Sequence, residues 1–92
     1  MDMKRFHKEV ESMQFKLKNY LDEPNHPKAK SIEQQFQKLE DEVQVGKGSH
    51  SIRARLKQIE SQLKPAYNAG VMSHGHYDDL EDWVRDCLQK IR

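Results

Sequence analysis

Apolar residues recur three or four positions apart along almost the whole chain. The first stripe consists of Met3, Phe6, Val10, Met13, Leu17 and Tyr20. The later stripes consist of Ala29, Ile32, Phe36, Leu39 and Val43; of Ile52, Leu56, Ile59, Leu63 and Ala66; and of Tyr77, Leu80, Val84, Cys87 and Ile91. This spacing gathers apolar side chains on one face of a helix, whereas a half-buried strand alternates with a period of two. The pattern therefore predicts an all-α protein.

Turn-forming residues between the stripes predict where the helices begin and end. The segment "DEPNHP" contains two prolines, and Pro27 suits the first turn of a helix. Gly70 suits the left-handed conformation in which many helices end. Together with the stripes, these signals predict helical segments over residues 3–22, 27–45, 51–69 and 74–91.

Two helix starts and one internal position leave alternatives open. Ser49 or Ser51 can cap the third helix, and Ser73 or Asp78 can cap the fourth. The motif "DDLE" resembles a capping box, and its acids would complement the positive end of a helix dipole. Pro65 has no backbone N–H, so we expect it to kink the third helix or to end it just before that residue.

Four helices joined by short loops most simply form a small antiparallel helical bundle with coiled-coil-like packing. Residues 1–92 then make a single helical domain. The alternative is a long helical hairpin that completes its core with a second copy. Hydrophobic residues are 35% of the chain and charged residues 34%, so the core is expected to be thin. We therefore expect a homo-oligomer or a protein partner that covers part of the surface.

The charge balance limits the classes of partner. Lys and Arg number 16 against 15 Asp and Glu, which gives no general attraction toward nucleic acid or anionic membranes. The charges are uneven along the chain, because residues 51–76 are mainly basic and residues 77–92 mainly acidic. This arrangement predicts two neighbouring segments that attract each other.

Several other classes are disfavoured by composition. No apolar run approaches the ~20 residues of a membrane span, and the first residues, "MDMKRFHKEVE", lack the apolar segment of a signal peptide. A single cysteine excludes an intramolecular disulfide. We expect a cytoplasmic, intracellular protein with no membrane partner, no cofactor and no small-molecule substrate.

Catalytic and metal chemistry have few candidates. His74 and His76 would point about 200° apart on a regular helix, so they could share a metal ion only if this stretch were a loop. Capping of the last helix is the favoured interpretation of the stretch. Cys87 lies in an apolar stripe, where a thiol usually serves as a small buried hydrophobe. No phosphate-binding loop or hydrolase motif is present, so we expect no enzyme.

A basic segment gives the alternative function. Lys47, Arg53, Arg55 and Lys57 gather around a predicted loop and helix start, where a phosphate could bind. Arg53 and Arg55 point to different faces of a helix, and no aromatic residue lies between them. The alternative prediction is a nucleic-acid-associated regulator that uses the segment 47–57.

Protein binding is the favoured function. Phe15 falls outside the first apolar stripe, at the outermost position of the heptad. Trp83 lies beside the last stripe, and tryptophan is a common interface anchor. Tyr77, Asp79 and Asp82 share that helix with Trp83 and complete the predicted protein-binding set. The prediction is a non-enzymatic protein–protein interaction module that self-associates, such as a small adaptor, inhibitor or regulatory subunit.

Overall fold

Four α-helices follow one another in the computed structural model, which describes residues 2–91. They are α1 (Met3–Tyr20), α2 (Pro27–Gln44), α3 (Ser49–Asn68) and α4 (His74–Lys90). No strand occurs among the described residues. Every helix lies within two residues of its predicted bounds, and the all-α prediction is confirmed.

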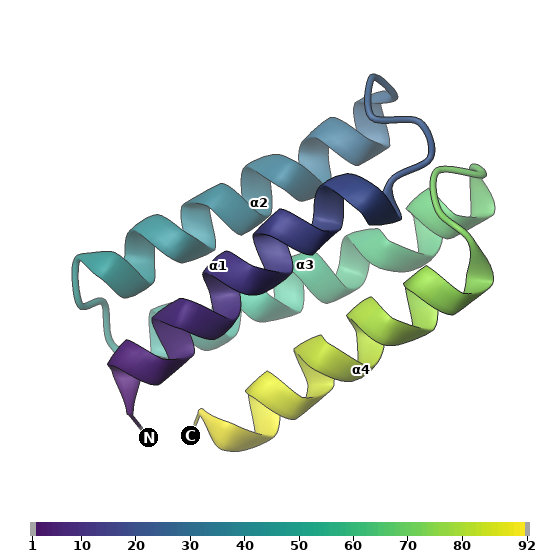
Figure 1. The fold of residues 1–92 in the computed structure, drawn as a ribbon. Helices are drawn as coiled ribbons and strands as arrows, with labels where there is room; N and C mark the ends of the chain where they lie inside the picture. Colours follow the sequence, from purple (N-terminus) through teal and green to yellow (C-terminus); the bar gives the residue numbers. More distant parts are fainter. Residues whose placement is uncertain (1, 92) are drawn as a thin grey trace.

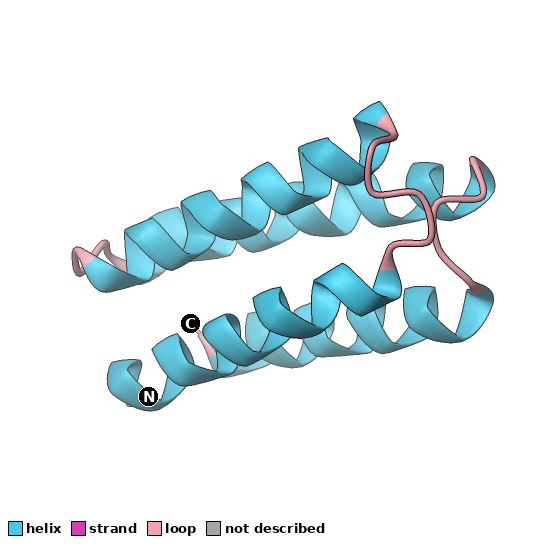
Figure 2. Cartoon of the chain, turned by 45° about the horizontal axis from the view of Figure 1, so that its top comes forward, coloured by secondary structure: helices cyan, strands magenta, loops and turns pink. Residues whose placement is uncertain are grey.

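The helices run antiparallel, and each packs against the next one in the chain (Figure 1). Figure 2 shows two layers, with α2 and α3 in one and α1 and α4 in the other. Side-chain contacts also join α1 to α4. The Tyr20 hydroxyl donates to Asp79 Oδ2 at 3.3 Å, and the Tyr20 ring stacks on His76. Lys90 Nζ lies 3.6 Å from Glu9 Oε1. The chain therefore forms the predicted antiparallel bundle and not a long hairpin.

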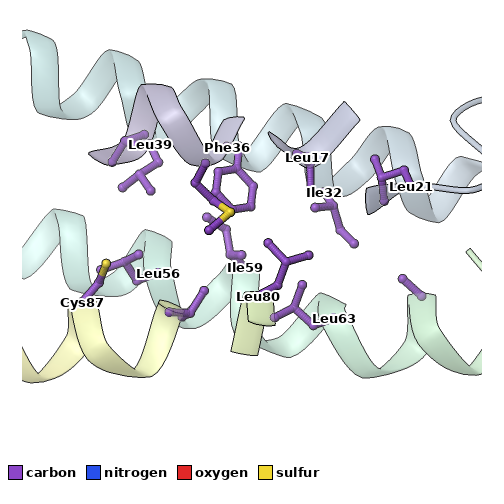
Figure 3. Packing of buried hydrophobic residues seen from close by; sticks show 14 of the residues in the cluster. Leu17, Leu21, Ile32, Phe36, Leu39, Leu56, Ile59, Leu63, Leu80 and Cys87 are labelled. Atoms are coloured by element: carbon purple, nitrogen blue, oxygen red, sulfur yellow. The ribbon is translucent and has the colours of Figure 1, made fainter. Parts of the chain in front are cut away.

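The interior of the bundle is apolar. Among the described residues, no polar or charged side chain is buried. The buried side chains come from all four stripes (Figure 3). Leu21, Val71 and Met72 of the loops join the same cluster. Since period-3.6 stripes face one another across the bundle, the chain buries its own apolar surface, and this burial is the main source of its stability.

The starts of the helices confirm two capping predictions and correct two others. Pro27 is the first residue of α2, and Ser73 caps α4 by accepting from the His76 N–H at 3.3 Å. Asp78 lies in the second turn, so the alternative that it caps α4 is wrong. Ser49 and Ser51 do not cap α3 either, because the helix begins one residue after Gly48, which has no side chain to cap it.

Helix α3 continues through Pro65 to Asn68, so the expectation that it ends before the proline is wrong. Pro65 is exposed and lies close to the helix end, where one missing N–H frees only the carbonyl four residues earlier. Gly70 has φ +78°, and its N–H donates to the Tyr67 carbonyl at 3.0 Å. The buried Val71 N–H donates to the Ala66 carbonyl at 3.0 Å, which completes a glycine-dependent helix end.

The basic α3 and the acidic α4 are neighbours, as their charges predicted. In the ion pair that joins them, the cation is on the acidic helix and the anion on the basic one: Arg85 of α4 lies 3.7 Å from Glu60 of α3.

No helix of the described chain is long and apolar enough to cross a membrane.

Candidate interaction surface

Phe15 lies on the outer side of α1, where its position in the helical period places it. The buried face of α1 consists of Phe6, Val10, Met13 and Leu17. Phe15 is two residues from both Met13 and Leu17, which turns it about 200° away from the core. Its side chain is 73% exposed, as the sequence predicted for this position.

Phe15 borders an open hollow between α1 and α2. The hollow has a volume of about 300 Å³ and is lined by Glu11, Gln14, Phe15, Lys18 and Glu40. A second hollow of about 470 Å³ continues along the same helix pair and shares Gln14 and Lys18 with the first. Its lining includes four further residues of α2, namely Lys30, Glu33, Gln34 and Gln37. We call these nine residues the α1–α2 face.

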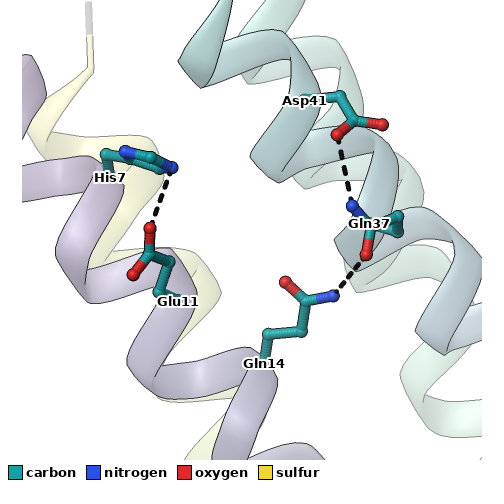
Figure 4. A network of polar contacts seen from close by, with 5 residues as sticks. All are labelled: His7, Glu11, Gln14, Gln37 and Asp41. Atoms are coloured by element: carbon teal, nitrogen blue, oxygen red, sulfur yellow. Dashed lines mark hydrogen bonds and ion pairs between the residues drawn. The ribbon is translucent and has the colours of Figure 1, made fainter.

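Side-chain amides connect the two helices of this face. Gln14 Nε2 donates to Gln37 Oε1 at 2.9 Å, and Gln37 Nε2 donates to Asp41 Oδ1 at 3.2 Å (Figure 4). Each bond holds a long side chain in one position, so part of the entropy cost of ordering the surface on binding is already met.

Charges of opposite sign occupy the two ends of the α1–α2 face. Because α1 and α2 are antiparallel, Glu11 and Glu40 lie toward one end, while Lys18 and Lys30 lie toward the other. Glu33 is the exception, since it lies beside the lysines. The face therefore has an acidic end, a basic end and Phe15 between Glu11 and Lys18.

The other residues of the predicted protein-binding set lie on α4 and do not join Phe15. Trp83 is partly buried against the core and stacks on Phe36 of α2, with ring centroids 5.7 Å apart. Tyr77 stacks on Tyr67 of α3 at 5.0 Å. Both aromatic rings therefore pack against aromatic residues of the same bundle.

The two aspartates of that set are exposed. Asp79 accepts the hydrogen bond from Tyr20 that helps to join α4 to α1. Partial burial, together with the negative charge of Asp79, raises the pKa of the Tyr20 phenol above its usual value of 10.0. The Asp82 side chain has no hydrogen bond or ion pair with another of the described residues.

His74 and His76 are held apart by the first turn of α4. The His74 ring meets the Tyr67 ring edge-on at 5.6 Å, and its Nδ1 lies 3.3 Å from Asp78 Oδ2. His76 instead stacks on Tyr20 at 4.3 Å, with the ring planes only 4° apart. One ring faces α3 and the other faces α1, so the structure does not bring them together around one ion.

The four basic residues of the alternative site do not form one surface. Arg55 turns toward α2, where its Nε donates to Glu42 and its Nη1 to Gln35, both at 2.7 Å. Arg53 turns toward α4 and donates to the Leu88 and Ile91 carbonyls. Lys47 and Lys57 are exposed and have no ion pair with a described residue. Two of the four cationic side chains therefore serve contacts within the bundle.

Cys87 is sealed in the core with 1% of its surface exposed. Burial, followed by the negative charges of Glu9 and Asp86, raises the pKa of its thiol to about 12. Because the thiolate is the nucleophilic form, this cysteine is unsuited to covalent catalysis at neutral pH.

Sequence reasoning identified Phe15 but missed its surroundings. Gln14 and Lys18 follow from helical spacing once Phe15 is placed outward. Glu40 and Gln37 come from α2, so their proximity to Phe15 and Gln14 depends on the register between the two helices.

Comparison of the chain with protein-family models, with curated proteins and with solved structures gave no match.

Proposed function

We propose that this chain is a non-enzymatic protein-binding module and that its α1–α2 face binds a second copy of the chain. The observation that carries the proposal is Phe15, a large apolar side chain that is 73% exposed in the middle of a helix. The other large apolar side chains exposed among the described residues are Met3 and Val45, which lie at or beside a helix end.

The charge pattern supports a second copy as the occupant. In a two-fold symmetric dimer the same patch of each copy forms the interface. Here the helices of one copy then run antiparallel to the same helices of the other. With the axis close to Phe15, Glu11 of each copy then faces Lys18 of the other, because these residues lie four before and three after the phenylalanine. On α2, Lys30 and Glu40 are related in the same way. The acidic end of one copy meets the basic end of the other.

The chemistry inside the bundle supports a binding role over a catalytic one. The buried side chains of the described residues are apolar, and the cysteine is shielded from solvent. Both hollows of the α1–α2 face are open to solvent and are lined by long, flexible side chains. This arrangement suits a protein surface better than a small substrate.

Sedimentation equilibrium tests the proposal. The unmodified chain is expected to form dimers, and Phe15→Ser should weaken dimerisation by at least about 30-fold, because an exposed aromatic at the centre of an interface contributes about 2 kcal/mol or more. Val45→Ser is the matched control, since Val45 is 71% exposed but lies at the C-cap of α2. Equal weakening by both substitutions, or a monomer at all concentrations, would contradict the proposal.

A charge exchange within one chain adds a second test. Lys18→Glu alone should weaken the dimer by about five-fold, because two exposed charge pairs are lost per dimer. Adding Glu11→Lys to the same chain should restore the affinity, since the pairs then form with exchanged signs. No restoration would overturn the proposed orientation.

A further inference from the structure

A histidine lies next to the two glutamates at the acidic end of the α1–α2 face. His7 and Glu11 are one helical turn apart on α1, and Glu40 reaches them from α2. One ligand atom from each residue, the imidazole nitrogen or a carboxylate oxygen, lies within 4.8 Å of the other two. Three groups that bind metal ions therefore converge between two helices.

One buried atom of this cluster and one buried atom next to it lack a hydrogen-bond partner. His7 Nε2 lies 3.2 Å from Glu11 Oε1 (Figure 4), yet it is shielded from solvent and has no aligned hydrogen bond. Gln14 Oε1, one turn beyond Glu11 on the same side of α1, is also buried without a hydrogen-bond partner. Buried polar atoms are normally paired, so two unpaired atoms beside two converging carboxylates favour a cation-binding site here.

The spacing fits a small transition-metal ion. Tetrahedral zinc with bonds of about 2.0–2.1 Å separates its ligand atoms by about 3.4 Å. The 3.2 Å between His7 and Glu11 is close to this value, and Glu40 has a flexible side chain that can close the remaining gap. Imidazole with two carboxylates is a ligand set typical of zinc and its neighbours, whereas magnesium and calcium prefer oxygen ligands alone.

We propose that His7, Glu11 and Glu40 bind a divalent transition-metal ion, with Zn²⁺ as the ion that fits best. The two glutamates also line the hollow of about 300 Å³ beside Phe15, so a fourth coordination position can be filled by water. The three residues come from both α1 and α2, so a bound ion would link the two helices and stabilise the bundle. This site does not depend on self-association of the chain.

The chain contains its own control for this site. His74 and Asp78 on α4 form a second histidine–carboxylate pair one turn apart, with Nδ1 and Oδ2 at 3.3 Å. No third ligand from a neighbouring helix meets this pair among the described residues. It therefore reproduces the local spacing of His7 and Glu11 but lacks the contribution of Glu40.

Isothermal titration of tag-free protein with zinc chloride tests the proposal. We expect one zinc ion per chain, and we expect His7→Ala and Glu40→Gln each to lower the affinity by at least about ten-fold, the effect of losing even an outer partner of a metal site. His74→Ala should leave the affinity unchanged. Cobalt titration should give the visible absorption bands of a bound ion in the unmodified chain and lose them in Glu40→Gln.

Circular dichroism shows whether each variant remains folded, and Glu40→Gln is chosen because it keeps the size of the side chain. The proposal is overturned if the unmodified chain binds no zinc, if His74→Ala lowers the affinity as much as His7→Ala, or if Glu40→Gln has no effect. Repeating the titration on Phe15→Ser separates the two proposals, since the metal site should persist in a chain that no longer dimerises.

Discussion

Trp83 of α4 stacks on Phe36 of α2 across the bundle, with ring centroids 5.7 Å apart and planes inclined by 27°. Phe36 is fully buried, so the only tryptophan of the chain is an extension of the core. Phe15 is the aromatic residue that the bundle leaves on its surface. The two aromatic residues expected to act together in binding therefore have different surroundings and should respond differently to substitution.

Trp83→Ala should lower the free energy of unfolding by about 2–3 kcal/mol. The loss is smaller than the 3–5 kcal/mol of a fully buried aromatic, because Trp83 retains some exposure. Phe15→Ala is the control and should change stability by about 0.5 kcal/mol or less. Urea denaturation of both variants measures the difference, and equal losses would show that Trp83 is not part of the core.

Arg53→Ala should destabilise the bundle by about 1–2 kcal/mol. The guanidinium donates to the Leu88 and Ile91 carbonyls at the end of α4, where the last carbonyls of a helix lack partners within the helix. Lys57→Ala is the matched control on the same helix, because this lysine is exposed, and its effect should be close to zero. Thermal unfolding distinguishes the two variants, and a loss at Lys57 equal to that at Arg53 would refute the capping role.

Gly70→Ala should destabilise the chain by about 1 kcal/mol, because φ +78° strains a residue with a Cβ atom. Gly75→Ala should instead stabilise it by about 0.5 kcal/mol, because Gly75 is helical and a Cβ there would meet no atom within 4 Å. Denaturant midpoints of the two variants should move in opposite directions. A shift in the same direction would contradict the helix end described at Gly70.

The Cys87 thiol of the folded chain should not react with a disulfide reagent at pH 8 and should react once urea unfolds the protein. Burial raises the pKa of the Cys87 thiol from 9.0 to about 12 in the folded chain. The buried neutral thiol therefore contributes its full stabilisation of the folded state below pH 9, and this stabilisation is lost as the pH rises through about 12. Cys87→Ala should lose less stability over this range. Rapid reaction of the folded chain at pH 8 would disprove the burial.

The sequence predicted the fold because each apolar stripe needs only the helical period within one segment. Phe15 was placed outward by the same local argument. The proximity of Glu40 to His7 was not predictable, since it depends on how α1 and α2 align along their length. The same holds for Arg53, whose partners are carbonyl groups 35 and 38 residues away. Cross-helix contacts follow from packing register, which a single sequence does not display.

The central claim is that the α1–α2 face binds a second copy of the chain. Dilution of ¹⁵N-labelled protein, followed by amide resonances, tests it most directly because every backbone position reports separately. The account predicts concentration-dependent shifts centred on Phe15 and extending to Glu11, Lys18 and Gln37, with little change at Lys57 or Lys64 of α3. Resonances that do not change with concentration, or shifts centred on α3 and α4, would contradict it.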